Sequence, residues 1–247
     1  MKITGLVFSL FIFFAAPLQA EGPPLLVAVD QSAPPFDMRG AHSQLYGFDI
    51  SMMEYICREI KRTCQYQAMP FGQLLPTVQS GKAEVAIGSI IITPERAQMV
   101  NFSNPYLNSE SRFISNAHAA QNNFTLSMLN NRKIGVEQDT VFPDIINSLA
   151  LTNPKVITYS KLETLIEDLY HGEIDFALMD NPTALYWQSQ SSGIIKPVGK
   201  PFSFGFGLGI AVRPGNTQLL QQINNALARF EKSPDFKRAY EQYLAYF

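Results

Sequence analysis

The sequence predicts an α/β protein made of two similar lobes, and two observations support this expectation. Predicted strands alternate with predicted helices, which requires crossover connections and therefore a mainly parallel sheet. The alternation also occurs twice. The segments "SGKAEVAIGSI" and "HGEIDFALMDN" both place a glycine that ends a helix, a short apolar strand and a final polar residue at matching positions. Two such units in one chain predict two sheets of similar construction.

The first unit contains a long amphipathic helix between its first two strands. This helix is predicted from Met53, Ile56 and Ile60, whose spacing is that of one buried helix face. Asp49 is its expected N-cap, and Gly81 is the expected end of a second, shorter helix. The expected strands are residues 25–30, 63–69 and 84–89, and the expected helices are residues 47–62 and 72–82.

The second unit repeats this order in the middle of the chain. Its expected strands are residues 132–139, 155–160 and 173–180, and its expected helices are residues 140–151 and 161–172. Aligning the units matches Asp30 with Glu137 at the ends of the first strands, and Ser89 with Asp180 at the ends of the third strands. Ligands of open α/β sheets bind outside the carboxyl ends of the strands, so we expect these residues to line a cleft between the lobes. The alternative is that Asp180 caps the following helix.

The last part of the chain is expected to return to the first lobe. A glycine-punctuated strand is predicted at residues 204–214, and two helices follow it, the second capped by Ser233. Two crossings between lobes predict a two-strand hinge around residues 107–112 and 200–205. The expected organisation is an export signal at residues 1–20, lobe 1 at residues 21–109 and 204–247, and lobe 2 at residues 110–203.

The N-terminus has the pattern of an export signal. Lys2 precedes an apolar run from Gly5 to Leu18, and "LQA" resembles a cleavage site, so we expect cleavage after Ala20. The run is shorter than the roughly 18 to 20 residues of a membrane-spanning helix. A retained N-terminal anchor is the alternative. No cysteine lies at the expected cut, so a lipid-anchored form is not expected.

Composition excludes some classes of partner. The formal net charge is −2, charged residues make up 16% of the chain, and no basic stripe is present, so nucleic acid is not an expected partner. The two cysteines, Cys57 and Cys64, are expected to form a structural disulfide in an exported protein. A zinc site needs about four ligands, and a redox site favours a tighter C-x-x-C spacing. No metal or cofactor is therefore expected.

Four stretches together resemble a known family. "YGFDISMMEYICREI", "AIGSIIITPERAQMVNFSNPY", "GEIDFALMD" and "GLGIAVRPGN" are similar to the periplasmic polar and basic amino-acid-binding proteins of ABC importers, within solute-binding protein family 3. The arginine receptors and the lysine/arginine/ornithine/histidine receptors are the subgroup they resemble most, and the spacing of Cys57 and Cys64 matches the disulfide of that subgroup. The resemblance implies a two-lobed periplasmic binding protein fold with a two-strand hinge. It also implies a monomer that delivers a free L-amino acid to an inner-membrane ABC permease.

The resemblance further implies one clamp for each charge of a zwitterionic ligand. Arg96 would hold the α-carboxylate, because a guanidinium binds a carboxylate through two parallel hydrogen bonds. Backbone amides of Thr140 and Val141, at the start of a helix, would assist it. Asp180 would hold the α-ammonium. Neighbouring site positions that the resemblance implies are Gly88, Ser89 and Ile91.

Side-chain selection is expected from Asp30, Glu137 and Phe71. A cation over an aromatic face gains about 0.5–2 kcal/mol, and two acids beside a flat ring suit a guanidinium. A glutamine amide would leave a buried carboxylate without a charge partner, which is unfavourable. L-Arginine is therefore the favoured ligand.

Three positions depart from the family pattern. Ala33 stands where the family usually has a second aromatic residue, and Phe36 compensates only if it turns inward instead of joining the core. Ile91 replaces a residue that usually shares the ammonium. Asp139 adds a negative charge near the carboxylate end of the site and is expected to point outward.

Three other interpretations are compatible with the sequence. Arg96 could form a surface ion pair with Glu95 or Glu110. The ligand could be lysine, ornithine, histidine or glutamine. A periplasmic dehydratase on the same fold, with Glu137 or Asp30 as general acid, is the enzymatic alternative, although no histidine lies in a catalytic motif.

Overall fold

The computed structural model describes residues 22–116 and 123–245. The expected export signal and its cleavage site after Ala20 lie outside the described residues. Within the described ranges, no helix has both the length and the apolar character needed to cross a membrane.

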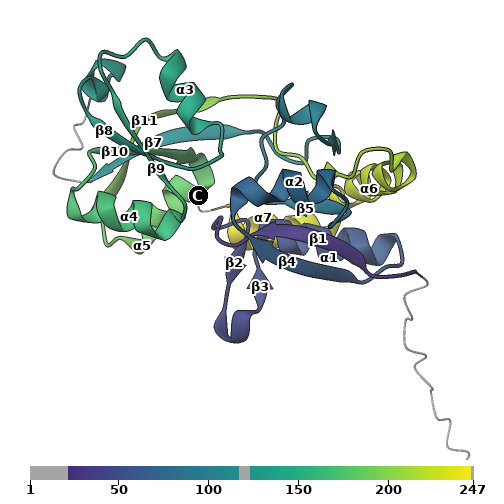
Figure 1. Ribbon diagram of the computed structural model, residues 1–247. Coiled ribbons are helices and arrows are strands. Elements are labelled where there is room, and N and C mark those ends of the chain that lie inside the picture. The colour runs from purple at the N-terminus through teal and green to yellow at the C-terminus, as the bar shows by residue number, and fades with distance from the viewer. Residues whose placement is uncertain (1–21, 117–122, 246–247) are drawn as a thin grey trace, which may run out of the picture.

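Two five-stranded sheets form the centres of two lobes (Figure 1). The first sheet has the order β4-β1-β5-β12-β6 and the second has the order β11-β7-β10-β8-β9. One strand in each sheet, β12 or β7, runs antiparallel to both neighbours, so the sheets are mixed but mainly parallel, as predicted. The strands are β1 (Leu25–Asp30), β4 (Cys64–Met69), β5 (Val85–Ile87), β6 (Asn101–Phe102) and β12 (Ala211–Val212), then β7 (Glu110–Asn116), β8 (Lys133–Glu137), β9 (Lys155–Tyr159), β10 (Phe176–Asp180) and β11 (Ile195–Ser203).

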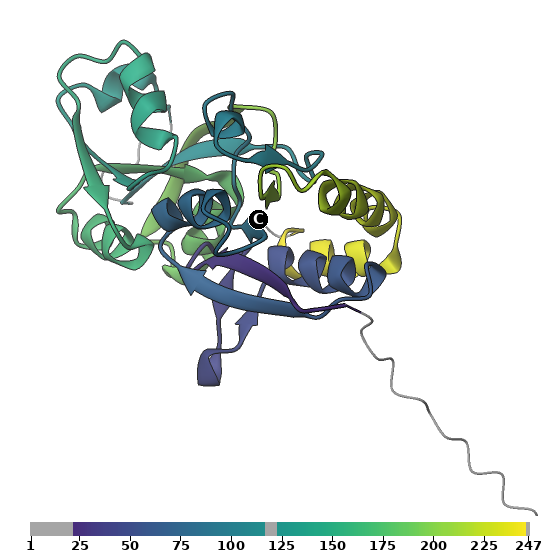
Figure 2. The ribbon, with the colours of Figure 1, turned by 45° about the vertical axis from the view of Figure 1, so that its right-hand side comes forward.

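Helices flank both sheets, and the C-terminal helices pack beside α1 (Figure 2). The first lobe carries α1 (Phe48–Glu59), α2 (Leu74–Gln79), α6 (Thr217–Phe230) and α7 (Pro234–Tyr243), and the second carries α3 (Phe142–Ser148), α4 (Leu162–His171) and α5 (Asn181–Gln190). Short 3-10 helices occur at Ala41–Ser43, Phe71–Gln73, Arg96–Gln98 and Leu126–Leu129. A small hairpin of β2 (Met38–Arg39) and β3 (Leu45–Tyr46), which the sequence patterns did not predict, projects from the first lobe in both ribbon views.

Helix ends test the predicted caps. Ser233 caps α7 as predicted, because its hydroxyl accepts a hydrogen bond from the backbone N–H of Phe236. Gly172 ends α4 with a φ of 78°, also as predicted. The prediction for Asp49 is wrong. Gly47 is the N-cap of α1, and Asp49 is a fully buried residue in the first turn.

The chain passes between the sheets twice, at residues 103–109 and 204–210. The two segments lie side by side, since Leu208 forms a β-bridge with Leu107. The backbone N–H of Gly207 also donates to the hydroxyl of Ser109 across 3.3 Å.

The strand predicted at residues 204–214 is mostly replaced by this crossing. Gly205 and Gly207 have φ values of 73° and 94°, which extended backbone does not adopt. A Cβ added at Gly205 would lie 2.6 Å from the carbonyl oxygen of Ile92. Only β12 therefore remains of the predicted strand.

The predicted disulfide is confirmed between Cys57 and Cys64, whose Cα atoms are 5.8 Å apart. It joins α1 to β4, the strand that follows it in the chain. The bond therefore fixes the C-terminal end of the helix to the edge of the first sheet.

Candidate functional site

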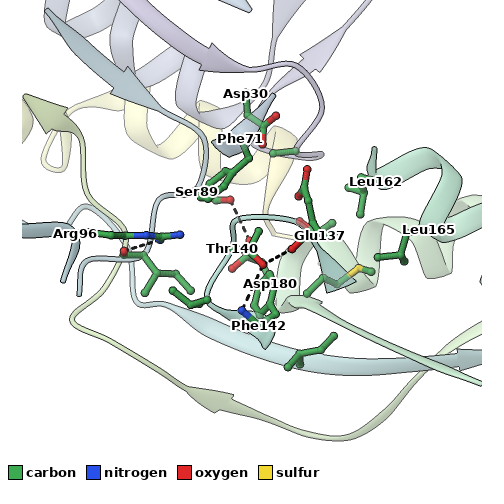
Figure 3. A pocket seen from close by; sticks show the side chains of 16 residues that line it. Asp30, Phe71, Ser89, Arg96, Glu137, Thr140, Phe142, Leu162, Leu165 and Asp180 are labelled. Atoms are coloured by element: carbon green, nitrogen blue, oxygen red, sulfur yellow. Dashed lines mark hydrogen bonds between the residues drawn. The ribbon is translucent and has the colours of Figure 1, made fainter. Parts of the chain in front are cut away.

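A cavity of about 30 Å³ lies between the two lobes and collects nearly every residue named from the sequence (Figure 3). The predicted site residues that line it are Asp30, Phe71, Ser89, Ile91, Arg96, Glu137, Thr140, Val141 and Asp180. Gly88 does not line it directly but lies behind Ser89, where an added Cβ would come within 2.9 Å of the Asp30 side chain. Sequence patterns missed the lining residues Phe142, Leu162, Leu165, Leu178, Met179 and Thr183.

Strand ends from both sheets meet at this cavity. Asp30 ends β1, Glu137 ends β8 and Asp180 ends β10, while Ser89 follows β5. The hydroxyl of Ser89 donates to Oδ2 of Asp180 across 3.0 Å, so two positions matched by the internal repeat touch each other (Figure 3). Asp180 occupies the N-cap position of α5, but its side chain makes no capping hydrogen bond. The capping alternative for its carboxylate is therefore wrong.

Arg96 lies at the other end of the cavity, in a 3-10 helix, and is only 9% exposed. Its Nη1 donates to the carbonyl oxygen of Ile91 at 2.9 Å and its Nη2 to that of Asp139 at 3.4 Å. Its Cζ lies 5.1 Å from the centroid of the Phe71 ring, within cation–π range. Burial lowers the pKa of Arg96 to about 10, with Asp180 opposing the shift, so the group stays charged at neutral pH. The surface ion-pair alternative does not apply to this buried side chain.

Three acids of the cavity hold protons more strongly than exposed carboxyls do. Burial raises the pKa of Asp30 to about 7, against hydrogen bonds from the backbone of Ser32 and Gln31. Burial likewise raises the pKa of Asp180 to about 7, with Ser89 and then Arg96 lowering it. The pKa of Glu137 is raised well above its usual range by burial and then by the charges of Asp30 and Asp180. A bound cation would favour the ionised forms of these acids.

Asp49 shapes the loop that carries Ser89. Its Oδ2 accepts hydrogen bonds from the backbone N–H groups of Gly88 (3.2 Å) and Ser89 (3.0 Å) and from the hydroxyl of Tyr106 (2.9 Å). Gly88 and Ser89 both have positive φ, 143° and 44°, a conformation that needs outside support at a serine. Asp49 supplies that support. The sequence pattern showed an acid near a helix start but gave no sign of this contact.

The three unusual positions also have defined places. Ala33 lines the cavity, whereas Phe36 is fully buried in the core of the first lobe and does not line it. Ile91 contributes its carbonyl oxygen to Arg96. Asp139 is exposed, as predicted, yet its carboxylate lies against Gly72 of the first lobe, at a point where a Cβ would be only 2.1 Å away.

Thr140 and Val141 connect β8 to α3. The hydroxyl of Thr140 donates to the carbonyl oxygen of Glu137 at 2.7 Å, and it accepts a longer hydrogen bond of 3.4 Å from the backbone N–H of Phe142. This turn places the first residues of α3 at the cavity wall (Figure 3). Among the described residues, no cluster of three or more His, Cys, Asp or Glu side chains could hold a metal ion.

Comparisons with known proteins agree on one class. ABC transporter arginine-binding protein 1 from Escherichia coli (strain K12) is 30% identical over 219 residues, which are 87% of this chain and 88% of that protein. An arginine transport-system periplasmic binding protein from Legionella pneumophila is 32% identical with a TM-score of 0.83, over 90% of this chain and 100% of that one. An ancestral arginine-binding protein with bound glutamine is 30% identical with a TM-score of 0.83, over 90% and 97% of the two chains.

The first two of these proteins are named as binding components of transport systems, in agreement with the expected non-catalytic receptor. The family model of bacterial extracellular solute-binding proteins, family 3, matches residues 25–246. Since that match covers nearly the whole chain, the protein belongs to the bacterial extracellular solute-binding proteins, family 3.

Proposed function

We propose that this protein is the periplasmic receptor of an amino-acid ABC importer and that it binds L-arginine in the cleft between its lobes. One observation carries the proposal. A single buried guanidinium, that of Arg96, lies at one end of a cavity whose other walls hold three carboxyl groups, those of the fully buried Asp30 and of the half-buried Glu137 and Asp180. An amino acid with a cationic side chain has the complementary charges, one carboxylate and two cations.

The proposed contacts follow this charge pattern. Arg96 and the backbone amides of Thr140 and Val141 bind the ligand's α-carboxylate. Asp180 binds the α-ammonium, and Asp30 and Glu137 bind the guanidinium. Phe71 stacks on the ligand's side chain, while Gly88, Ser89 and Ile91 complete the ammonium end.

Charge balance favours arginine over glutamine. Arg96 and three ionised acids give the cleft two net negative charges, and arginine offsets one of them. Glutamine carries no net charge, so Asp30 and Glu137 would have to stay protonated or remain buried without a partner. Because a similar ancestral protein was solved with glutamine, glutamine is kept among the alternative ligands.

Ligand access requires the lobes to separate. A cavity of about 30 Å³ has space for roughly two water molecules, which is far less than an amino acid of arginine's size needs. We propose hinge motion of lobe 1 (residues 21–109 and 204–247) against lobe 2 (residues 110–203), through the two crossing segments. The mature receptor, cleaved after Ala20, acts as a monomer and delivers arginine to an inner-membrane permease.

Ligand-induced thermal stabilisation tests the proposal. Ligand at 1,000 times its Kd adds about 4 kcal/mol to the free energy of unfolding. We expect arginine to raise the melting temperature most, followed by lysine and ornithine, with histidine and glutamine weaker. Calorimetric titration of the same panel gives the affinities. If no amino acid stabilises the mature protein, the proposed function is wrong, and if glutamine binds more tightly than arginine, the side-chain assignment is wrong.

A further inference from the structure

Around the cleft, side chains of the described residues form hydrogen bonds between the lobes at three places: Ser89 with Asp180, Arg96 with Asp139, and Ser32 with Glu163. Two of them use groups that the proposed function assigns to the ligand. Asp180 accepts from Ser89, and Arg96 donates to the carbonyl oxygen of Asp139. A bound zwitterion competes for the carboxylate of Asp180 and the guanidinium of Arg96. Neither hydrogen bond is therefore expected to stabilise the closed form once the ligand is bound.

The third contact leaves the ligand groups free. The hydroxyl of Ser32 donates to Oε1 of Glu163. Ser32 lies in the loop after β1, in the first lobe, and Glu163 lies in the first turn of α4, in the second lobe. Neither side chain lines the cavity. This contact can therefore persist when a ligand occupies the cleft.

Ser32 also touches the acidic end of the site. Its backbone N–H donates to Oδ1 of Asp30 at 3.3 Å. On the other side of the contact, Glu163 lies between Leu162 and Leu165, which both line the cavity. One serine thus joins a ligand-facing carboxylate in the first lobe to the helix that forms the cavity wall in the second.

We propose that Ser32 and Glu163 are positioning residues that hold the cleft closed over its ligand and orient Asp30 for the ligand's cationic side chain. The inference rests on the proposed function, because it takes the ligand to occupy this cleft. The charge of Glu163 also contributes to the raised pKa values of Asp30 and Glu137, which places it near the acidic end of the cavity.

The inference predicts a change in dissociation rate and not in association rate. A contact that forms only on closure slows ligand release, whereas the open form meets the ligand without it. Ser32→Ala and Glu163→Ala should each raise the dissociation rate of arginine by about three- to tenfold, the range for one partly exposed hydrogen bond. Association rates should stay within about twofold of wild type. The melting temperature without ligand should be close to that of wild type.

Further variants test whether the hydrogen bond between Ser32 and Glu163, and not the charge of Glu163, slows ligand release. Glu163→Gln keeps an oxygen that accepts from Ser32 and should restore a dissociation rate within about twofold of wild type. The double variant Ser32→Ala/Glu163→Ala should dissociate no faster than either single variant, because both remove the same contact. Glu167→Ala, which removes an exposed acid one turn further along α4, is the matched control and should leave the dissociation rate unchanged.

Stopped-flow measurement of arginine dissociation provides the main test. A second measurement needs no ligand: fluorophores at the exposed positions 82 and 155, one on each lobe, report the closed fraction by energy transfer. Ser32→Ala and Glu163→Ala should lower that fraction. Unchanged dissociation and an unchanged closed fraction would overturn the inference, as would an effect of Glu163→Gln as large as that of Glu163→Ala. Failure of wild type to bind arginine would instead count against the proposed function, and the closed fraction would still decide the role of the contact.

Discussion

The two lobes bring equivalent strand ends to one cleft, but the two resulting pairs differ. The third strands present Ser89 against Asp180, a hydroxyl against a carboxylate, and these side chains form a hydrogen bond. The first strands present Asp30 against Glu137, two carboxyls whose pKa values are raised by burial, and the charge of Asp30 raises the pKa of Glu137 further. The first pair is joined by a hydrogen bond that leaves Oδ1 of Asp180 without a partner among the described residues, whereas the second pair places two acids at one end of the cavity. In the proposed function, this difference assigns the ligand's cationic side chain to the Asp30–Glu137 end and its α-ammonium to Asp180.

Removal of Arg96 should have the largest effect on binding. Arg96→Ala leaves the ligand's α-carboxylate without its charge partner in a closed, buried site, which costs about 2–5 kcal/mol. The Kd for arginine should therefore rise at least thirtyfold in calorimetric titration. Arg39→Ala removes an exposed guanidinium from the same lobe and serves as the control. Equal losses in the two variants would contradict the proposed carboxylate clamp.

The Asp30–Glu137 pair should respond in opposite ways with and without ligand. Glu137→Gln removes one of two carboxyls that repel each other, so the ligand-free protein should melt at a higher temperature at pH 8. Arginine should bind about tenfold more weakly, because one charge-assisted hydrogen bond becomes neutral. Thermal melting and calorimetry measure both effects. A variant that loses both stability and affinity would show that Glu137 stabilises the fold and is not an acid that lacks a charge partner until the ligand binds.

The pH dependence of stability follows from the same acids. Asp30 and Asp180 each have a folded-state pKa near 7, above the unfolded value of about 3.9, so the folded state binds more protons between these values. Their contribution to the stability of the ligand-free protein is therefore complete below about pH 4 and is lost as the pH rises through 7. A bound cation favours ionised acids, so the stabilisation by arginine should grow from pH 5 to pH 8. Melting curves at several pH values, with and without arginine, test both slopes.

Much of this cleft was predictable because strand ends are encoded by short, local patterns. Apolar runs that stop at Asp30, Glu137 and Asp180 mark carboxyl ends of parallel strands, and parallel strands bring those ends to one edge of a sheet. The repeated order of elements then predicts two such edges. Local patterning and the repeat were enough to place the acids together.

Contacts set by tertiary geometry were not predictable in this way. Asp49 occurs where an N-cap is common, but Gly47 takes that position with a φ of 136°. A Cβ there would lie 2.1 Å from the carbonyl oxygen of Phe36, so the fold requires glycine. Leu162 lies in the helix predicted at residues 161–172, but it lines the cleft only because of how α4 packs. No periodic pattern distinguishes these outcomes.

Asp49 holds the backbone of Ser89 in the Ser89–Asp180 pair, and two substitutions should separate the effect of its accepting oxygen from that of its charge. Asp49→Leu removes the acceptor for the backbone N–H groups of Gly88 and Ser89, which should lower the free energy of unfolding by about 1.5–3 kcal/mol. Asp49→Asn retains an accepting oxygen and should be tolerated. Denaturant unfolding of the two variants provides the measurement. Equal destabilisation by both would show that the negative charge, and not the acceptor, supports the loop.

The smallest expected effect is that of Asp139, which lies close to Arg96, the residue proposed to bind the ligand's α-carboxylate. Its carboxylate lies against Gly72, while its backbone carbonyl accepts from Arg96. Asp139→Asn keeps the shape of the side chain and removes a negative charge that repels the ligand's α-carboxylate. Because this side chain is exposed, arginine affinity should rise only about two- to threefold at low salt. The gain should vanish at about 0.5 M salt, where screening acts over a few ångströms. A gain that persists at high salt would mean that the substitution alters the Gly72 contact and not the field around Arg96.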